Sequence, residues 1–88
     1  MQKWKGTATR TMIMTLTTCE VGSQAIVREI RGGTGVRRKL NRLGIHSGDT
    51  IRIIRSGFLG GPVLVEIHGA ALGIGRGMAE KVEVEISG

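Results

Sequence analysis

Four cationic side chains, Arg37, Arg38, Lys39 and Arg42, fall within six positions of the segment TGVRRKLNRLGIHSGD, residues 34–49. Guanidinium and ammonium groups at this density attract nucleic-acid phosphates, acidic protein surfaces or anionic lipids. The whole chain carries 13 Lys and Arg against 7 Asp and Glu, and its formal net charge of +6 favours the same partners. Charge alone does not choose among them, and a solvated helix face would show the same run of cations.

Three side chains could bind a transition metal: Cys19, His46 and His68. Because no two of them have the close spacing of a dedicated site, the sequence predicts no metal site. The three could still converge in space, or meet across an oligomer interface with Glu66 or Asp49. Taken singly, Cys19 is typical of a small buried hydrophobic residue and His68 of an exposed hairpin residue. A single cysteine also excludes an internal disulfide, which fits a reducing cytosol.

Catalytic chemistry finds little support in the sequence. Two histidines and seven acidic residues, mostly at alternating outward positions, offer no convincing pair for general acid–base catalysis. The stretch GFLGGP lacks the Gly-Lys-Ser/Thr ending of a phosphate-binding loop, and GIGRG lacks the long buried strand of a dinucleotide fold. Both stretches are typical of turns. We therefore expect a protein that is not an enzyme and that needs no cofactor.

Nucleic-acid binding is the main rival to protein docking. Small barrels bind RNA, and a basic helix could align with phosphates. This chain has one Trp, one Phe and no Tyr, so it lacks the aromatic platforms on which bases stack. Binding through phosphates alone would be weak and non-specific, and we therefore expect no specific nucleic-acid partner.

The cationic run lies on a predicted helix. Val36, Leu40 and Leu43 recur at i, i+4 and i+7, which places them on one side of that helix. Thr34 is expected to cap its N-terminus and Gly44 to end it in a left-handed conformation. The apolar side would then pack on the domain and leave the cations on the other sides.

The remaining segments favour short strands between glycine turns. Strand patterns occupy residues 24–30, 51–55, 63–67, 72–74 and 82–86. In the first of them, Ile26, Arg28 and Ile30 are expected to share one face; in the last, apolar residues alternate with Glu83 and Glu85. Five short strands, with one helix inserted after the first, predict a mainly β fold, a small and strongly curved antiparallel barrel.

The chain of 88 residues is expected to form a single domain. Residues 1–14 show neither a helical nor a strand period and are predicted to be an N-terminal tail, whereas residues 15–88 are predicted to form the barrel. No apolar run is long enough for a signal segment or a membrane span, so we expect a cytoplasmic protein.

Taken in order, these segments resemble the FeoA-domain family of small SH3-like barrels. The resemblance covers Leu16 to Ile86 and rests on L..C..G..A.V..I, RRKLNRLGIHSGD, GGPVLVEIHG and LGIGRGMAEKVEV. Its most specific part is the basic helix followed by Leu-Gly-Ile-x-x-Gly-Asp. The chain departs from the family pattern at His46, where a small residue is usual, and at Ser47, where proline is common. The same barrel resembles the C-terminal domain of iron- and manganese-dependent repressors, although this chain lacks a helix-turn-helix.

The resemblance implies an accessory protein of bacterial ferrous iron uptake that works with a FeoB-type membrane transporter, whose cytosolic part is a GTPase. On this basis we expect Arg37, Arg38 and Arg42 to steer docking onto that cytosolic part, with Phe58 and Leu59 as apolar contacts. Three alternatives remain open: regulation of the transporter's GTP hydrolysis cycle, nucleic-acid binding by the small barrel, and self-association through an open sheet edge.

Overall fold

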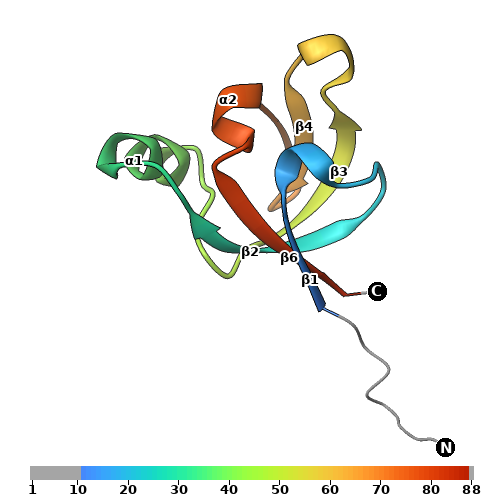
Figure 1. The fold of residues 1–88 in the computed structure, drawn as a ribbon, viewed down its shortest axis with the longest axis horizontal. Coiled ribbons are helices and arrows are strands. Elements are labelled where there is room, and N and C mark those ends of the chain that lie inside the picture. The colour runs from blue at the N-terminus through green and yellow to red at the C-terminus, as the bar shows by residue number, and fades with distance from the viewer. Residues whose placement is uncertain (1–10, 88) are drawn as a thin grey trace, which may run out of the picture.

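The computed structural model describes residues 11–87 of the chain, the side chains of Thr11, Phe58 and Ser87 excepted (Figure 1). Its strands are β1 (Thr11–Thr15), β2 (Gln24–Ile30), β3 (Thr50–Ser56), β4 (Val63–Ile67), β5 (Ala70–Ile74) and β6 (Val82–Ser87). Helix α1 spans Thr34–Arg42 and helix α2 spans Arg76–Ala79. Two short 3₁₀ turns span Leu16–Thr18 and Phe58–Gly60.

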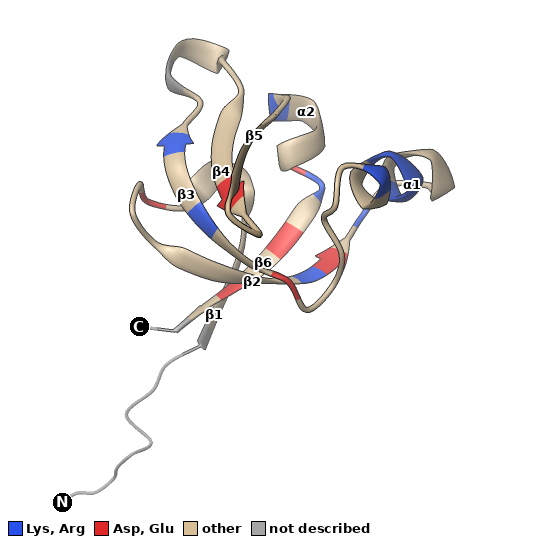
Figure 2. Ribbon diagram, turned by 180° about the vertical axis from the view of Figure 1, so that it is seen from behind, with Lys and Arg blue, Asp and Glu red and all other residues tan. Residues whose placement is uncertain are grey.

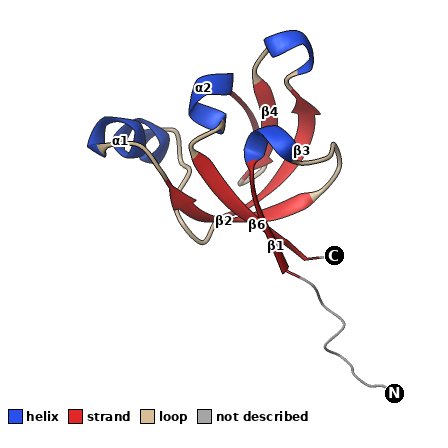
Figure 3. Cartoon of the chain, viewed as in Figure 1, coloured by secondary structure: helices blue, strands red, loops and turns tan. Residues whose placement is uncertain are grey.

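The strands form one antiparallel sheet in the order β1-β6-β2-β3-β4-β5. The sheet is strongly curved, and α2 lies between α1 and the β3–β4 connection in the views of Figures 1 and 3. The predicted mainly β architecture with an inserted basic helix is therefore confirmed. The described sheet has six strands rather than about five, and α1 follows the second strand rather than the first.

The additional strand is β1, which includes residues 11–14 that the sequence assigns to the tail. It pairs antiparallel with β6, so that Met12 lies opposite Ile86 and Met14 opposite Val84. Strand β1 is too short and too rich in Thr and Met to show a clear alternation, and its extended form depends on β6 as a partner. The barrel thus begins earlier than predicted, while the rest of the predicted tail, residues 1–10, lies outside the described residues.

Apolar side chains from every part of the sheet fill one core. The largest fully buried ones are Leu16, Val27, Leu40, Ile45, Ile51, Ile53, Val63, Val65, Ile74, Val82 and Val84. None of the polar or charged residues in the described part of the chain is buried. The alternation predicted for β6 is confirmed, because Val82 and Val84 point inward while Glu83 and Glu85 are only half-buried.

Strand β2 departs from the alternation that its sequence predicts. Ala25 and Val27 are buried, whereas Ile26 is 42% exposed on the opposite face. The pairing with β6 shifts register between Val27 and Glu29, and this bulge returns Ile30 to the core. The prediction that Ile26 shares a face with Ile30 is therefore wrong, because an irregular residue breaks the two-residue period.

Helix α1 forms over the residues predicted for it, with different ends. Gly33 rather than Thr34 is the N-cap, and no side chain caps the first turn. Gly44 adopts φ 96 and ends the helix as predicted, with the N–H of Ile45 donating to the carbonyl oxygen of Leu40 at 2.9 Å. This turn sends Ile45 into the core beside Leu40.

Candidate functional site

The cations of α1 form one exposed surface. Arg37, Arg38, Lys39 and Arg42 are all exposed, and Figure 2 shows Lys and Arg concentrated on this helix. Lys39 and Arg42 lie in its last turn, where positive charge complements the helix dipole. The guanidinium of Arg37 also donates to the carbonyl oxygen of Ile30 at 3.4 Å, so this side chain has a structural contact that its neighbours lack.

Ion pairs between the described residues lie elsewhere on the molecule. Arg28 of β2 pairs with Glu85 of β6, and Arg31, which directly follows β2, pairs with Glu83 of β6. Within residues 11–87, no acidic side chain forms an ion pair with Arg38, Lys39 or Arg42. The α1 cations are therefore available to a negatively charged partner.

The predicted apolar contacts lie in the β3–β4 connection. The side chain of Phe58 lies outside the described residues. Leu59 is 87% exposed and has φ 58, a left-handed conformation that a branched side chain rarely adopts. Gly57 anchors the loop, because its carbonyl oxygen accepts a hydrogen bond of 3.1 Å from Nη1 of Arg76 on α2. Helix α2 thus lies between this loop and α1, and the predicted contact residues occupy two separate surfaces (Figure 1).

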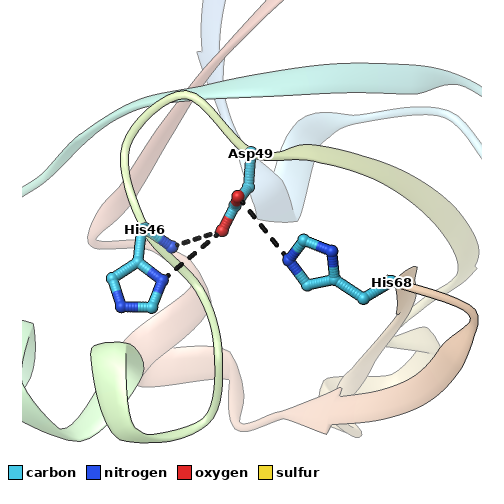
Figure 4. Close-up of polar contacts among 3 residues, drawn as sticks. All are labelled: His46, Asp49 and His68. Carbon is cyan, nitrogen blue, oxygen red and sulfur yellow. Dashed lines mark hydrogen bonds and ion pairs between the residues drawn. The ribbon is translucent and has the colours of Figure 1, made fainter.

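Asp49 lies between the two histidines (Figure 4). Its Oδ2 accepts a hydrogen bond of 2.8 Å from the backbone N–H of His46 and lies 3.6 Å from Nδ1 of that residue. Its Oδ1 lies 3.6 Å from Nε2 of His68. Contacts of 3.6 Å are too long for hydrogen bonds, so each imidazole becomes an ion-pair partner of Asp49 only when protonated.

The turns of the chain bring this cluster together. His46 and Asp49 flank a turn in which Gly48 has φ 96 and the N–H of Asp49 donates to the carbonyl oxygen of His46 at 3.1 Å. His68 and Gly69 form the two-residue connection of β4 and β5, with φ 52 and 82, as a type I′ hairpin requires. The sequence identifies both turns, but their proximity in space depends on the fold.

The cluster does not have the arrangement of a metal centre. His46 and His68 approach different oxygens of Asp49, and the described residues contain no group of three or more His, Cys, Asp or Glu that could hold a metal ion. Cys19 is separate from the cluster and buried, with its thiol 3.4 Å from the carbonyl oxygen of Thr15. Burial raises the pKa of the Cys19 thiol, which keeps it protonated and weakly nucleophilic at neutral pH.

The sequence misplaces one side chain at the C-terminal end of α1, that of its C-cap residue Leu43. Leu43 is predicted to pack with Leu40, yet Leu40 is fully buried whereas Leu43 is 41% exposed. Leu43 follows the last helical residue, Arg42, and lines a groove between α1 and the start of α2. Helical spacing predicts burial for both leucines. The exposure of Leu43 becomes evident only from the groove that lies between it and α2.

None of the helices in the described part of the chain is long and apolar enough to cross a membrane.

Comparison with known proteins identifies relatives of the whole domain. The family model of the FeoA domain matches residues 14–86. The protein named "Putative Fe(2+) transport protein A" of Methanocaldococcus jannaschii is 38% identical over 64 residues, which cover 73% of this chain and 76% of the relative.

Solved structures share the fold. A crystal structure of the iron uptake regulatory protein FeoA has a TM-score of 0.75 and 34% identity, covering 83% of this chain and 95% of that one. A manganese-dependent transcriptional repressor has a TM-score of 0.78 at 21% identity, covering 84% of this chain and 41% of the repressor, which shows a likeness of fold alone. Because the family model spans nearly all described residues and is supported by a relative above 30% identity, the chain belongs to the FeoA-domain family.

Proposed function

We propose that this protein is a cytosolic accessory protein of ferrous iron uptake, and that it docks onto the cytosolic part of a FeoB-type GTPase transporter. Its membership of the FeoA-domain family and the name of its relative, an Fe(2+) transport protein A, support the link to iron transport. The role is non-catalytic: the protein acts by binding.

The observation that supports docking is the exposed cationic surface of α1. Three of its cations, Arg38, Lys39 and Arg42, have no acidic partner among residues 11–87, although other arginines of the same domain do. Exposed charges without internal partners speed the encounter with an acidic surface, while apolar contacts slow dissociation. An acidic region of the transporter's cytosolic part is the complementary partner.

Leu59 supplies the apolar contact that slows dissociation from the transporter. A leucine that is 87% exposed in a left-handed conformation contributes little to the fold, and glycine would fit that backbone better. Leu59→Gly should therefore leave the free energy of unfolding within about 1 kcal/mol of wild type. It should nevertheless speed dissociation from the transporter, because it removes the side chain that makes the contact.

The test measures binding of the protein to the purified cytosolic region of the transporter from the same organism. The variant R38E/R42E should weaken binding about tenfold or more, mainly through slower association. The matched control R52E/R55E makes the same change in net charge on exposed arginines of β3. Equal loss in both variants would mean that only total charge matters, and an unchanged R38E/R42E would remove α1 from the proposal.

Regulation of the transporter's GTP cycle is the alternative, and the same reagents separate it. The rate of GTP hydrolysis by the isolated cytosolic region is measured with and without saturating protein. Docking alone predicts an unchanged rate. A change that R38E/R42E abolishes would instead assign a regulatory role to the α1 surface.

A further inference from the structure

A groove of about 570 Å³ lies between the end of α1 and the segment that joins β5 to α2. Lys39 and Leu43 line it on the α1 side, and Ile74, Met78 and the glycines at 73, 75 and 77 line it on the other. Ile74 belongs to the core, Met78 is half-buried and Leu43 is 41% exposed. The groove therefore offers an apolar surface that the described chain leaves uncovered.

Of the glycines on one wall of this groove, Gly75 is the N-cap of α2, where glycine is common, but neither packing nor capping explains Gly77. Gly75 has φ −55, Gly77 lies inside α2, and a Cβ atom added at either position would meet nothing within 4 Å. Glycine destabilises a helix relative to alanine, so Gly77 is unfavourable for α2 itself. Missing side chains at these positions leave room for another backbone to approach closely.

The groove begins at the end of a free sheet edge. Strand β5 is last in the sheet order and, within residues 11–87, pairs with β4 alone. Its outer N–H and C=O groups can therefore pair with an added strand, a common way for proteins to bind extended segments. A segment that continues past Ile74 would enter the groove.

The charge of the surroundings indicates the chemistry of the occupant. Lys39 is the only charged residue that lines the groove in the described chain, and Arg38 and Arg42 are exposed on the same helix (Figure 2). An apolar floor beside unpaired cations fits an aliphatic side chain with neighbouring carboxylates. Nucleic acid fits less well, because its phosphates gain nothing from Leu43 and Met78.

We propose that this groove binds an extended acidic segment of a partner protein. One aliphatic side chain of the segment packs between Leu43 and Met78, and a neighbouring carboxylate pairs with Lys39. The identity of the partner rests on the proposed function, since the transporter's cytosolic region is taken to supply the segment. The chemistry of the groove can be tested without the transporter.

The first experiment is an NMR titration with a short capped peptide in which Asp and Leu alternate. Amide shifts should change at residues 39–43 and 73–78, and a peptide of alternating Lys and Leu should produce none of these changes. Gly77→Met fills the groove and should weaken peptide binding about tenfold or more. Gly35→Met is its matched control, because Gly35 is also a helical glycine with nothing within 4 Å of an added Cβ, but lies outside the groove.

Unfolding temperatures and amide spectra check that both glycine variants are folded. We expect both to fold, because the space around each position is open. The proposal is overturned if the groove shows no shift changes, if Gly77→Met leaves peptide binding intact, or if an oligonucleotide binds these residues where the peptide does not. Shift changes at the groove that follow protein concentration alone would make a second copy of the chain the occupant and also overturn it.

The second experiment repeats the comparison with the transporter's cytosolic region. Loss of both peptide and transporter binding in Gly77→Met supports the groove and the proposed function together. Transporter binding that survives in Gly77→Met leaves the proposed function standing and overturns the assignment of the groove to this partner. If the wild-type protein binds the peptide but not the transporter, the proposed function is overturned. The assignment of the groove to an extended acidic segment then still holds.

Discussion

The β2–β6 face and the α1–α2 side of this domain treat similar residues in opposite ways. On the first, Arg28 and Arg31 pair with Glu85 and Glu83. On the second, the cations of α1 have no acidic partner within residues 11–87, and Leu43 lines an open groove. Arg52 and Arg55 of β3 also form no ion pair among these residues, so an unpaired charge alone does not mark a binding surface. The α1 side differs because several unpaired cations lie together beside an open apolar groove, which suits it to a partner.

The largest expected effect separates the two leucines of the α1 region. Leu40→Ala should lower the free energy of unfolding by about 2 to 5 kcal/mol, because it leaves a cavity in the core. Leu43→Ala should cost less than about 1 kcal/mol, because much of that side chain is already in water. Chemical denaturation of both variants provides the measurement. Similar losses would show that Leu43 serves the fold and that the contrast between the two sides is wrong.

An intermediate effect concerns salt. Raising the salt concentration from about 50 to 500 mM should slow association with the transporter's cytosolic region about tenfold, because exposed charges are screened. The association rate of R38E/R42E should depend on salt much less. Stopped-flow mixing at several salt concentrations measures both slopes. A variant in which Arg28 is changed to Glu should keep most of the wild-type slope if the α1 side is the one that meets the partner.

The smallest expected effect tests the paired side. A double-mutant cycle with Arg28→Ala and Glu85→Ala should give a coupling energy of about 0.2 to 1 kcal/mol, the range for exposed ion pairs. The same cycle with Lys39→Ala and Glu85→Ala should give a value near zero, since no ion pair joins these residues. Thermal unfolding of the four proteins in each cycle gives the energies. Equal coupling in both cycles would remove the distinction between paired and unpaired cations.

Local patterns in the sequence are sufficient to predict part of this structure. The helical spacing of Val36 and Leu40, the glycine that ends α1 and the alternation of β6 each depend on a few neighbouring residues, and all three are confirmed. The likeness to the FeoA-domain family followed from motifs that are likewise local in sequence. These features are the same in any fold that buries the apolar face. They can therefore be predicted from the sequence alone.

Tertiary structure decided the rest, because the deciding contacts join residues far apart in the chain. Strand β1 exists through its pairing with β6, and the bulge that returns Ile30 to the core belongs to the β2–β6 ladder. Asp49 meets His68 only because two turns converge. Leu43 has the spacing of a core residue, but the placement of α2 makes it the wall of a groove. Sequence therefore determined the segments whose period is local, helix α1 and strand β6 among them. Packing determined strand β1 and which surfaces stay open, since pairing and exposure depend on neighbours that are distant in the chain.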